Sequence, residues 1–148
     1  MIVIRKAETK DAATAASLAC LLWPDNNAKK MTSEFENLTS SVDAAVFLAE
    51  QNEQAIGFAQ CQLRRDYVEG TATSPVGYLE GIFVQKEYRR QGIAKSLLKA
   101  CEAWSQERGC MEFASDCELT NAESLRFHQA LGFAEANRII CFTKQIGA

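Results

Sequence analysis

The segment 88–94 constrains the fold of this chain more than any other. Its sequence, Tyr88-Arg89-Arg90-Gln91-Gly92-Ile93-Ala94, follows an apolar run over 78–84 and precedes an amphipathic segment over 94–107. The pattern predicts a strand, a tight turn at Gly92 and a helix. The first N–H groups of such a helix have no partner within it and lie at the positive end of its dipole. With Arg89 and Arg90 beside them, they predict a pyrophosphate site.

The spacing Arg89-x-x-Gly92-x-Ala94 resembles the acyl-coenzyme A pyrophosphate loop of the GNAT family of N-acetyltransferases. Two later segments follow in the family's order, Asn121-Ala122-Glu123-Ser124 at a helix start and Leu131-Gly132-Phe133 at its end. The resemblance implies acetyl-CoA as a co-substrate. The residues expected to bind it are Ile82, Phe83, Val84, Arg89, Arg90, Gln91, Gly92, Ile93, Ala94, Lys95 and Asn121.

A P-loop is the rival phosphate motif, since Ala94-Lys95-Ser96 resembles its Gly-Lys-Ser end. We reject it because a P-loop needs glycine where this chain has Arg89 and Ala94.

Length and composition indicate one domain, residues 1–148, of a cytoplasmic protein. The net charge of −3 disfavours a nucleic-acid partner, and no apolar run is long enough to span a membrane. The N-terminus is charged too early for a signal peptide. Six cysteines without a Cys-x-x-Cys pair, and a single histidine, predict reduced core or boundary thiols and no metal site.

Hydrophobic periodicity and turn residues predict the remaining elements. The expected strands are 2–6, 45–50, 55–64, 77–84, 111–115, 133–135 and 138–144. The expected helices are one capped by Thr9 or Asp11 with Ala15, Leu18 and Leu22 on one face, then 28–38, 94–107 and 121–131. This order predicts an α/β fold, a mixed sheet with helices on both faces. The resemblance implies the GNAT fold, in which the sheet is mostly antiparallel and a splayed central strand forms the acyl-CoA cleft.

Two carboxylates are candidates for the chemistry. Glu80 lies inside the central strand, where a charge is costly without a partner or a function. It is either the base that takes the acceptor amine's proton or a buried acid paired with an arginine, and the resemblance favours the base. Strict alternation puts residues 80, 82 and 84 on one face and 79, 81 and 83 on the other. Asp116 follows a strand end, where α/β sheets bind ligands, or it caps the loop 117–121.

Three further side chains are less specific. Tyr67, in the polar loop 66–75, could donate a hydrogen bond to a carbonyl, a thiolate or a substrate hydroxyl, or anchor the loop. Trp23 could stack on a sugar or a cation, or belong to the core. His128 stands where many GNAT enzymes carry the tyrosine that protonates the departing thiolate. We interpret it as structural, which leaves the general acid open among His128, Tyr67 and solvent.

A finer resemblance is to the short bacterial aminoglycoside 6′-N-acetyltransferases. It rests on 22–24, 66–70, 74–75, 79–84, 112–116 and 128–133. It implies an aminoglycoside pocket lined by Trp23, Tyr67, Glu80 and Asp116, with Asn137 where the subfamily has another acid. It also implies a homodimer, to which the apolar segment 139–142 could contribute.

The expected function is therefore acetyl transfer from acetyl-CoA to an aminoglycoside 6′-amine, by direct attack in a ternary complex. Polycationic substrates suit an acidic pocket. The alternatives are an acetyltransferase of a polyamine, peptide or other small amine, and a non-catalytic acyl-CoA-binding regulator, which would need no base.

Overall fold

A five-stranded sheet organises the first part of the chain. The computed structural model describes residues 1–148 in two units, Met1–Asp116 and Cys117–Ala148. The strands are β1 (Ile2–Lys6), β2 (Ala44–Gln51), β3 (Gln54–Arg64), β4 (Val76–Val84) and β5 (Phe113–Ala114), in this spatial order. Neighbours from β1 to β4 are antiparallel, and β5 is parallel to β4. The predicted mixed, mostly antiparallel sheet is confirmed.

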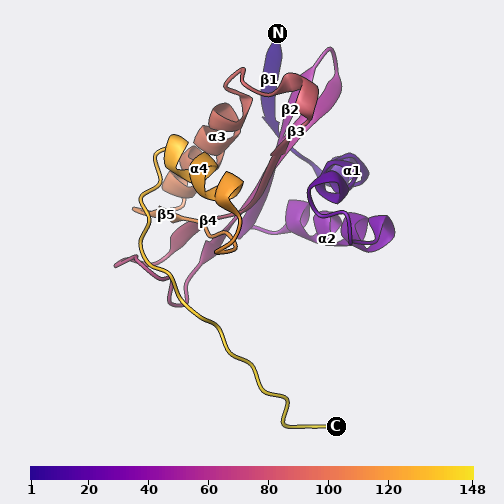
Figure 1. Ribbon diagram of the computed structural model, residues 1–148. Coiled ribbons are helices and arrows are strands. Elements are labelled where there is room, and N and C mark those ends of the chain that lie inside the picture. The colour runs from indigo at the N-terminus through magenta and orange to yellow at the C-terminus, as the bar shows by residue number, and fades with distance from the viewer. The chain divides into compact units, whose positions relative to one another are not determined.

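Helices cover both faces of this sheet (Figure 1). The 3₁₀ turn η1 (Thr9–Asp11), α1 (Ala12–Leu22) and α2 (Ala28–Ser40) lie on one face. On the other lies α3 (Ile93–Glu107), which follows the 3₁₀ turn η2 (Lys86–Tyr88). The predicted core stripe of α3 is buried at Ile93, Leu97, Leu98, Cys101 and Trp104. These helical bounds agree with the sequence prediction to within two residues where it gave limits.

A β-bulge at Glu80 changes which way β4 presents its side chains. Gly81 pairs with Gln60 and Leu79 with Cys61, so Glu80 is an extra residue without an opposite partner on β3. Before the bulge, a methyl group at residue 77 would meet Ser105 of α3; after it, one at residue 81 would meet Trp23 at the end of α1. The predicted strict alternation over 79–84 is therefore wrong, because one extra residue shifts the phase of a strand.

The pairing between β4 and β5 is brief. Only Gly77 and Tyr78 have partners on β5, namely Phe113 and Ala114. The remainder of β4, residues 79–84, has a neighbouring strand only on the β3 side. The two strands thus part after Tyr78, which agrees with the expected splayed central strand. The expected strand 111–115 is correspondingly shorter, at two residues.

The second unit contains one helix, α4 (Ala122–Ala130), followed by Gly132 with a φ of 95°. Residues 133–148 form neither of the two predicted closing strands, so that prediction is wrong for the single chain. Strand residues need a neighbouring edge for their backbone hydrogen bonds, and this segment pairs with none. Its large apolar side chains are exposed, at 63% for Ile139, 79% for Ile140 and 87% for Phe142.

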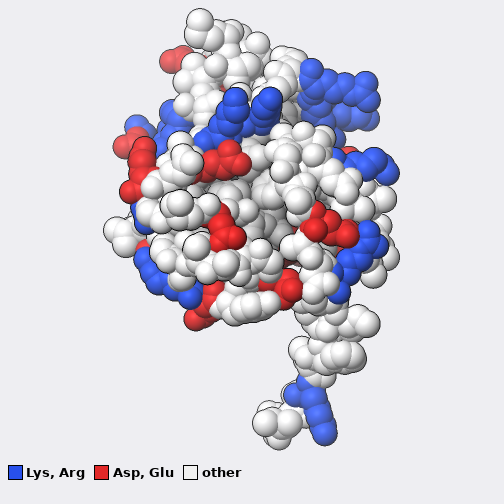
Figure 2. Space-filling model, turned by 90° about the vertical axis from the view of Figure 1, so that its left-hand side faces the viewer, with Lys and Arg blue, Asp and Glu red and all other residues white.

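The six cysteines are all free thiols. Cys61, Cys101 and Cys110 are buried and Cys20 is partly buried, whereas Cys117 and Cys141 are exposed, contrary to the predicted core or boundary position. No group of three or more His, Cys, Asp or Glu side chains could hold a metal ion. None of the helices has the length and apolar character to cross a bilayer. Figure 2 shows acidic and basic side chains in separate small groups on the face that it draws.

Candidate active site

A bidentate ion pair fixes Glu80. The Arg64 guanidinium donates from Nε to Oε2 at 3.2 Å and from Nη2 to Oε1 and Oε2 at 3.0 and 2.9 Å. Arg64 is the last residue of β3. The Glu80 side chain remains 20% exposed and that of Arg64 38% exposed. Pairing with an arginine, the alternative to the favoured interpretation of Glu80 as the base, is what the structure shows, and the role as base stays a prediction.

Tyr78 connects this ion pair to Asp116. Cζ of Arg64 lies 3.5 Å from the centroid of the Tyr78 ring, a cation–π contact. The Tyr78 hydroxyl donates a hydrogen bond to Oδ2 of Asp116. Burial, and then the Asp116 hydrogen bond, raises the pKa of Tyr78, so the phenol keeps its proton and remains a donor. The structure thus gathers both predicted carboxylates, Glu80 and Asp116, which we call the acidic pair.

Trp23 lies beside the acidic pair. A methyl group at residue 81 would lie 2.5 Å from Cη2 of Trp23, so the indole rests on the glycine that follows Glu80. The same indole meets Phe58 edge to face, with centroids 6.2 Å apart, and packs on the core under α1 and α2. The ring of Trp23 therefore belongs to the core, and its stacking on a sugar or a cation of the substrate stays a prediction.

Tyr67 is placed differently from the other predicted pocket residues. Its side chain is 80% exposed, and its hydroxyl donates to the Glu69 carboxylate on the same loop. This hydrogen bond raises the pKa of Tyr67, which makes the phenol a weaker acid than a free tyrosine. Tyr67 is not brought into hydrogen-bond contact with the acidic pair, and its catalytic role stays a prediction.

The turn before α3 has the predicted anion-binding backbone. Gly92 is the N-cap of α3 with a φ of 78°, and Arg90 also has a positive φ of 67°. The N–H of Ser96 bonds to the Gly92 carbonyl at 3.1 Å, so the N–H groups of residues 93–95 precede the first helical hydrogen bond. No atom lies within 4 Å of where a side chain on Gly92 would begin. The helix start is therefore open to a ligand.

The two arginines of this loop have different surroundings. Nε of Arg89 donates to the Val84 carbonyl at 2.8 Å, and its guanidinium lies 5.5 Å from the centroid of the Phe83 ring. Arg89 therefore fastens the loop to the end of β4. Arg90 and Lys95 are exposed at the helix start, together with Gln91. Arg89 is also exposed, so all four polar side chains predicted to bind the phosphates are accessible to solvent.

The second unit holds the remaining predicted residues. Oδ1 of Asn121 accepts from the Ser124 N–H at 3.0 Å, which confirms its N-cap role. Nδ1 of His128 lies 2.8 Å from the Ser124 carbonyl, and its ring lies 5.2 Å from that of Phe133, as expected for a structural histidine. Oδ1 of Asn137 accepts from the next residue's N–H at 2.8 Å. Cofactor binding by Asn121 and substrate binding by Asn137 stay predictions.

Arg64 and Tyr78 are the site residues that sequence reasoning missed. A signal existed for Arg64, because a carboxylate in a central strand calls for a cation and the preceding strand ends at Arg64, with Arg65 directly after it. The second, Arg65, turns instead to Asp43, with 3.1 Å between Nη1 and Oδ2. For Tyr78 no signal existed, since its partner Asp116 is distant in sequence.

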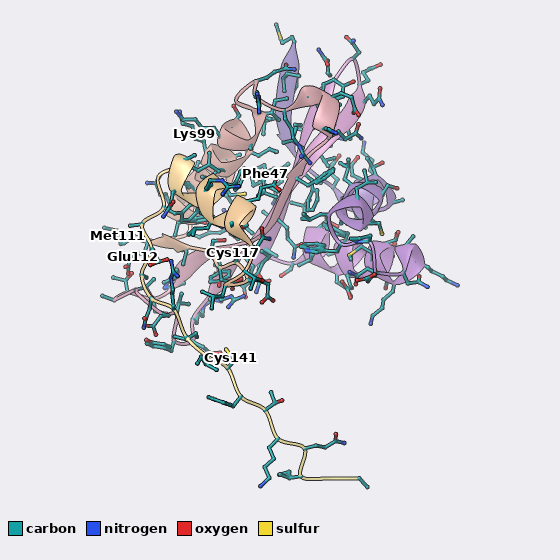
Figure 3. All side chains as sticks on the ribbon, viewed as in Figure 1. Phe47, Lys99, Met111, Glu112, Cys117 and Cys141 are labelled. Carbon is teal, nitrogen blue, oxygen red and sulfur yellow. The ribbon has the colours of Figure 1, made fainter.

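A separate groove of 630 Å³ lies between the second half of α3 and the segment leading into β5. Figure 3 labels three residues of its wall, Lys99 on α3 and Met111 and Glu112 before β5. Neither member of the acidic pair lines this groove. Glu112 also accepts from the N–H groups of Ala72 and Thr73, at 2.9 and 2.8 Å, and so fastens the end of the loop that carries Tyr67.

Comparison with known proteins agrees with this arrangement. The model of the acetyltransferase (GNAT) family matches residues 14–133. The aminoglycoside N(6′)-acetyltransferase type 1 of Acinetobacter baumannii is 44% identical over 131 residues, which are 88% of this chain and 90% of that protein. The protein of the same name from Serratia marcescens is 38% identical over 148 residues, 99% of this chain and 100% of that one.

Solved structures give the same result. AAC(6′)-Iy in complex with the bisubstrate analog CoA-S-monomethyl-acetylneamine has a TM-score of 0.94 and 37% identity, over 99% of both chains. The 6′-N-acetyltransferase AAC(6′)-Ih from Acinetobacter baumannii has a TM-score of 0.94 and 41% identity, over 99% of this chain and 100% of that chain. The fold and the resemblance predicted from the sequence are confirmed.

Proposed function

The chain belongs to the acetyltransferase (GNAT) family, and we propose that it transfers an acetyl group from acetyl-CoA to the 6′-amine of an aminoglycoside, as a single domain spanning 1–148. The observation that carries the proposal is the acidic pair, Glu80 and Asp116, beside the strand edge that β5 leaves open. The relatives' names specify the same amine and the same antibiotic class. Acetylation removes one positive charge from the drug and adds bulk, which weakens its binding to ribosomal RNA.

Acetyl-CoA lies along β4 and the loop before α3 in this proposal. The open helix start at Gly92, with the exposed cations Arg89, Arg90 and Lys95, receives the pyrophosphate. Residues 82–84 have no neighbouring strand on the β5 side, so their backbone is available to hold the pantetheine arm and the thioester. Asn121, in the second unit, is the proposed further contact. A structure of a similar protein with bound CoA supports this co-substrate.

The acceptor binds as an ammonium and must lose a proton before it attacks. We assign proton removal to Glu80, through a water molecule, and retention of the drug's cationic groups to Asp116, Trp23 and Asn137. The neutral amine then attacks the thioester carbonyl, a C–N bond forms, the C–S bond breaks and the thiolate leaves. The attacking nitrogen loses its second proton as the amide forms, one proton is taken up by the thiolate, and Tyr67 is proposed to donate a hydrogen bond in this step.

Release of free thiol from acetyl-CoA tests the proposal directly. The purified protein is assayed with an aminoglycoside that bears a 6′-amine and with the matched 6′-hydroxyl analogue. Thiol release with the amine, and NMR of a product acetylated at the 6′ nitrogen, are expected. An acetyl group on another ring nitrogen contradicts the 6′ assignment.

The same assay separates the alternatives. Turnover of polyamines or peptides without turnover of any aminoglycoside identifies a general amine acetyltransferase. Binding of acetyl-CoA without thiol release from any amine identifies a regulator.

A second copy of this chain is the proposed partner of the C-terminal segment 138–148. The segment is extended, and Ile139, Ile140, Phe142 and Ile146 are 63–93% exposed, which is costly for a segment in water. The alignments to solved structures cover 99% of this chain, so they include this segment. Light scattering on the full chain is expected to give a dimer, and Phe142→Asp to give a monomer. Lys144→Glu, in the same segment, is the control that stays dimeric.

Charge and chemistry support our proposals on other partners and on the compartment. The net charge of −3 supports the proposal that the protein has neither a nucleic-acid nor a membrane partner. Free thiols and the use of acetyl-CoA support a cytoplasmic location.

A further inference from the structure

Arg64, the last residue of β3, contacts two side chains of β4, Glu80 and Tyr78. Its guanidinium contacts both oxygens of Glu80, at 2.9 and 3.0 Å from Nη2, and its Cζ lies over the Tyr78 ring, 3.5 Å from the centroid. The neighbouring Arg65 makes an ordinary exposed ion pair with Asp43. Arg64 is thus held from two sides, by a carboxylate and by a buried aromatic ring.

We propose that Arg64 is a positioning residue for Glu80: it holds the carboxylate in one orientation beside the bound amine. This inference rests on the proposed function, in which Glu80 takes the proton. A glutamate has three rotatable side-chain bonds, and a two-point contact with a planar guanidinium selects one arrangement of them. The Tyr78 ring limits where the guanidinium itself can lie.

The charges around Glu80 determine what removal of Arg64 does. Arg64 on β3 is the cation that contacts it, and the Tyr78 phenol lies beneath that cation. Asp116, bonded to the same phenol, is the nearby like charge. The helix α1 also packs on β4, and Cys20 is its only titratable group. Without Arg64, Glu80 would keep a like charge nearby and lose its counter-ion, so its proton affinity rises.

The test is the pH dependence of kcat/KM in matched variants. Arg64→Met retains much of the side-chain volume without the charge, and Arg64→Lys retains the charge without the two-point grip. For Arg64→Met we expect the acidic limb of the kcat/KM profile to move to higher pH by about one pH unit. At the low-pH end of this limb, kcat/KM should be roughly tenfold below that of the parent, and the difference should become smaller at high pH. Arg64→Lys should keep the position of the limb but lower kcat severalfold. Arg65→Met is the control and should match the parent.

A carboxyl NMR titration of Glu80, without substrate, gives the second readout. The Glu80 signal should follow a different pH course in Arg64→Met from that in the parent and in Arg65→Met. An unchanged Glu80 titration in a folded Arg64→Met variant overturns the inference, whether or not the protein acetylates aminoglycosides. If the titration shifts but no variant acetylates any amine, the proposed function fails while the electrostatic role of Arg64 stands. If Arg64 only stabilised the fold, Arg64→Met would lower the free energy of unfolding and leave both the kcat/KM profile and the Glu80 titration unchanged.

Discussion

The indole of Trp23 occupies the space above Gly81, where a methyl group would lie 2.5 Å from Cη2 and 2.8 Å from Cζ2 of the ring. A side chain at residue 81 therefore displaces the tryptophan. Trp23 is also the C-cap residue of α1 and contacts Phe58, so its position is tied to the core. This relationship makes Gly81 a sensitive probe of the acceptor site.

For Gly81→Ala we expect a Michaelis constant for the aminoglycoside at least severalfold higher. Overpacking should also lower the free energy of unfolding by about 1–3 kcal/mol. Steady-state kinetics and urea unfolding measure the two effects. Gly147→Ala, where no atom lies within 4 Å of the new methyl group, is the control and should change neither. A Gly81→Ala variant with parental kinetics would show that Trp23 does not contact the drug.

Tyr78→Phe separates the two contacts of Tyr78. The ring under Arg64 remains, whereas the hydrogen bond to Asp116 is lost. If the hydroxyl orients Asp116 toward the drug's ammonium groups, the Michaelis constant should rise severalfold with little change in kcat. In the double variant with Asp116→Asn the two effects should not add, because they act through one contact. Additive effects would indicate independent roles.

Substitutions at the two members of the acidic pair should impair catalysis in two different ways. Glu80→Gln keeps the shape of the side chain but loses its basicity, and kcat should fall by roughly 10²-fold, the usual contribution of a general base. Asp116→Asn should mainly raise the Michaelis constant for the drug. Acetyl-CoA affinity, measured by calorimetry, should remain near the parental value in both variants. The opposite pattern, with Asp116→Asn inactive and Glu80→Gln normal, would reverse the two assignments.

Local sequence signals predicted much of the fold because the elements follow them closely. Residues close together in the sequence predict the apolar alternation of the strands, the turn at Gly92 and the apolar stripe of α3. The bulge at Glu80 was not, because an extra residue is defined only by the register of β3 against β4. The closing strands were predicted wrongly for a related reason. Residues 138–144 have strand-like composition, but a strand forms only where a second edge is present.

The residues of the candidate site were also predicted only in part. Glu80, Asp116 and Trp23 were predicted from residue type and resemblance, and the structure brings all three to one side of β4. Arg64 and Tyr78 were missed because their importance comes from contacts across strands. Predicting that Arg64, not Arg65, pairs with Glu80 requires knowing where β3 ends and how it pairs with β4.

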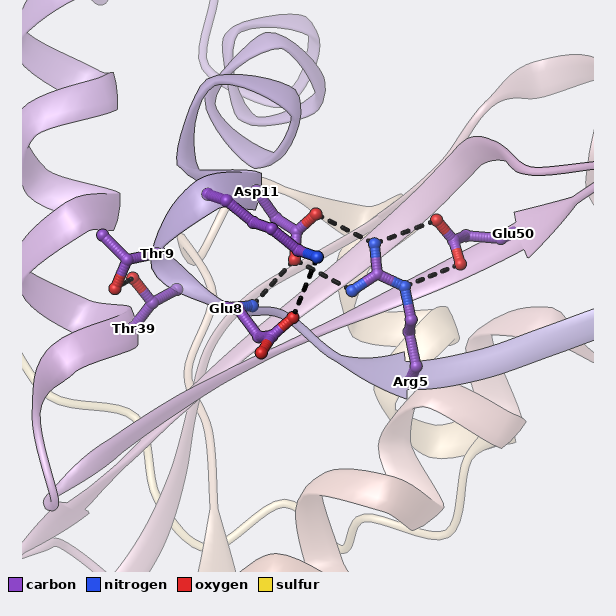
Figure 4. Close-up of polar contacts among 7 residues, drawn as sticks. Arg5, Glu8, Thr9, Asp11, Thr39 and Glu50 are labelled. Atoms are coloured by element: carbon purple, nitrogen blue, oxygen red, sulfur yellow. Dashed lines mark hydrogen bonds and ion pairs between the residues drawn. The ribbon is translucent and has the colours of Figure 1, made fainter.

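Figure 4 shows a second ion-pair network, far from this chemistry in the sequence. Nη1 and Nη2 of Arg5 donate to both oxygens of Asp11 at 2.8 and 2.9 Å, and Nε donates to Glu50 at 2.7 Å. Asp11 also accepts from the Glu8 N–H at 2.8 Å, and its side chain is 12% exposed. Arg5 thereby ties β1 to β2 and to the turn before α1. The hydrogen bond from Arg5 lowers the pKa of Asp11 to about 2.

This depressed pKa predicts a loss of stability in acid. A carboxyl whose pKa is lower in the folded state stabilises the fold above its unfolded pKa, near 3.8, and loses that contribution as the pH falls toward 2. The contribution should be about 1–2 kcal/mol at neutral pH. Asp11→Asn should therefore be less stable than the parent at pH 7 by denaturant unfolding, with the difference shrinking between pH 4 and pH 2. Asp43→Asn, from an exposed pair with Arg65, is the control with little effect.

Two substitutions at Gly92, similar in size and different in charge, test whether the loop before α3 binds coenzyme A. Gly92 has a φ of 78°, a conformation that asparagine and aspartate tolerate better than other side chains, and its surroundings are open. Gly92→Asp brings a carboxylate to the helix start that we propose binds pyrophosphate. Coenzyme A affinity should fall at least tenfold, about 1.4 kcal/mol or more. Gly92→Asn adds a similar volume without charge and should lose less affinity. Calorimetry measures both, with circular dichroism as the check of folding. Equal losses in the two variants would attribute the effect to the turn's backbone, and unchanged affinity in a folded Gly92→Asp variant would exclude this turn as the phosphate site.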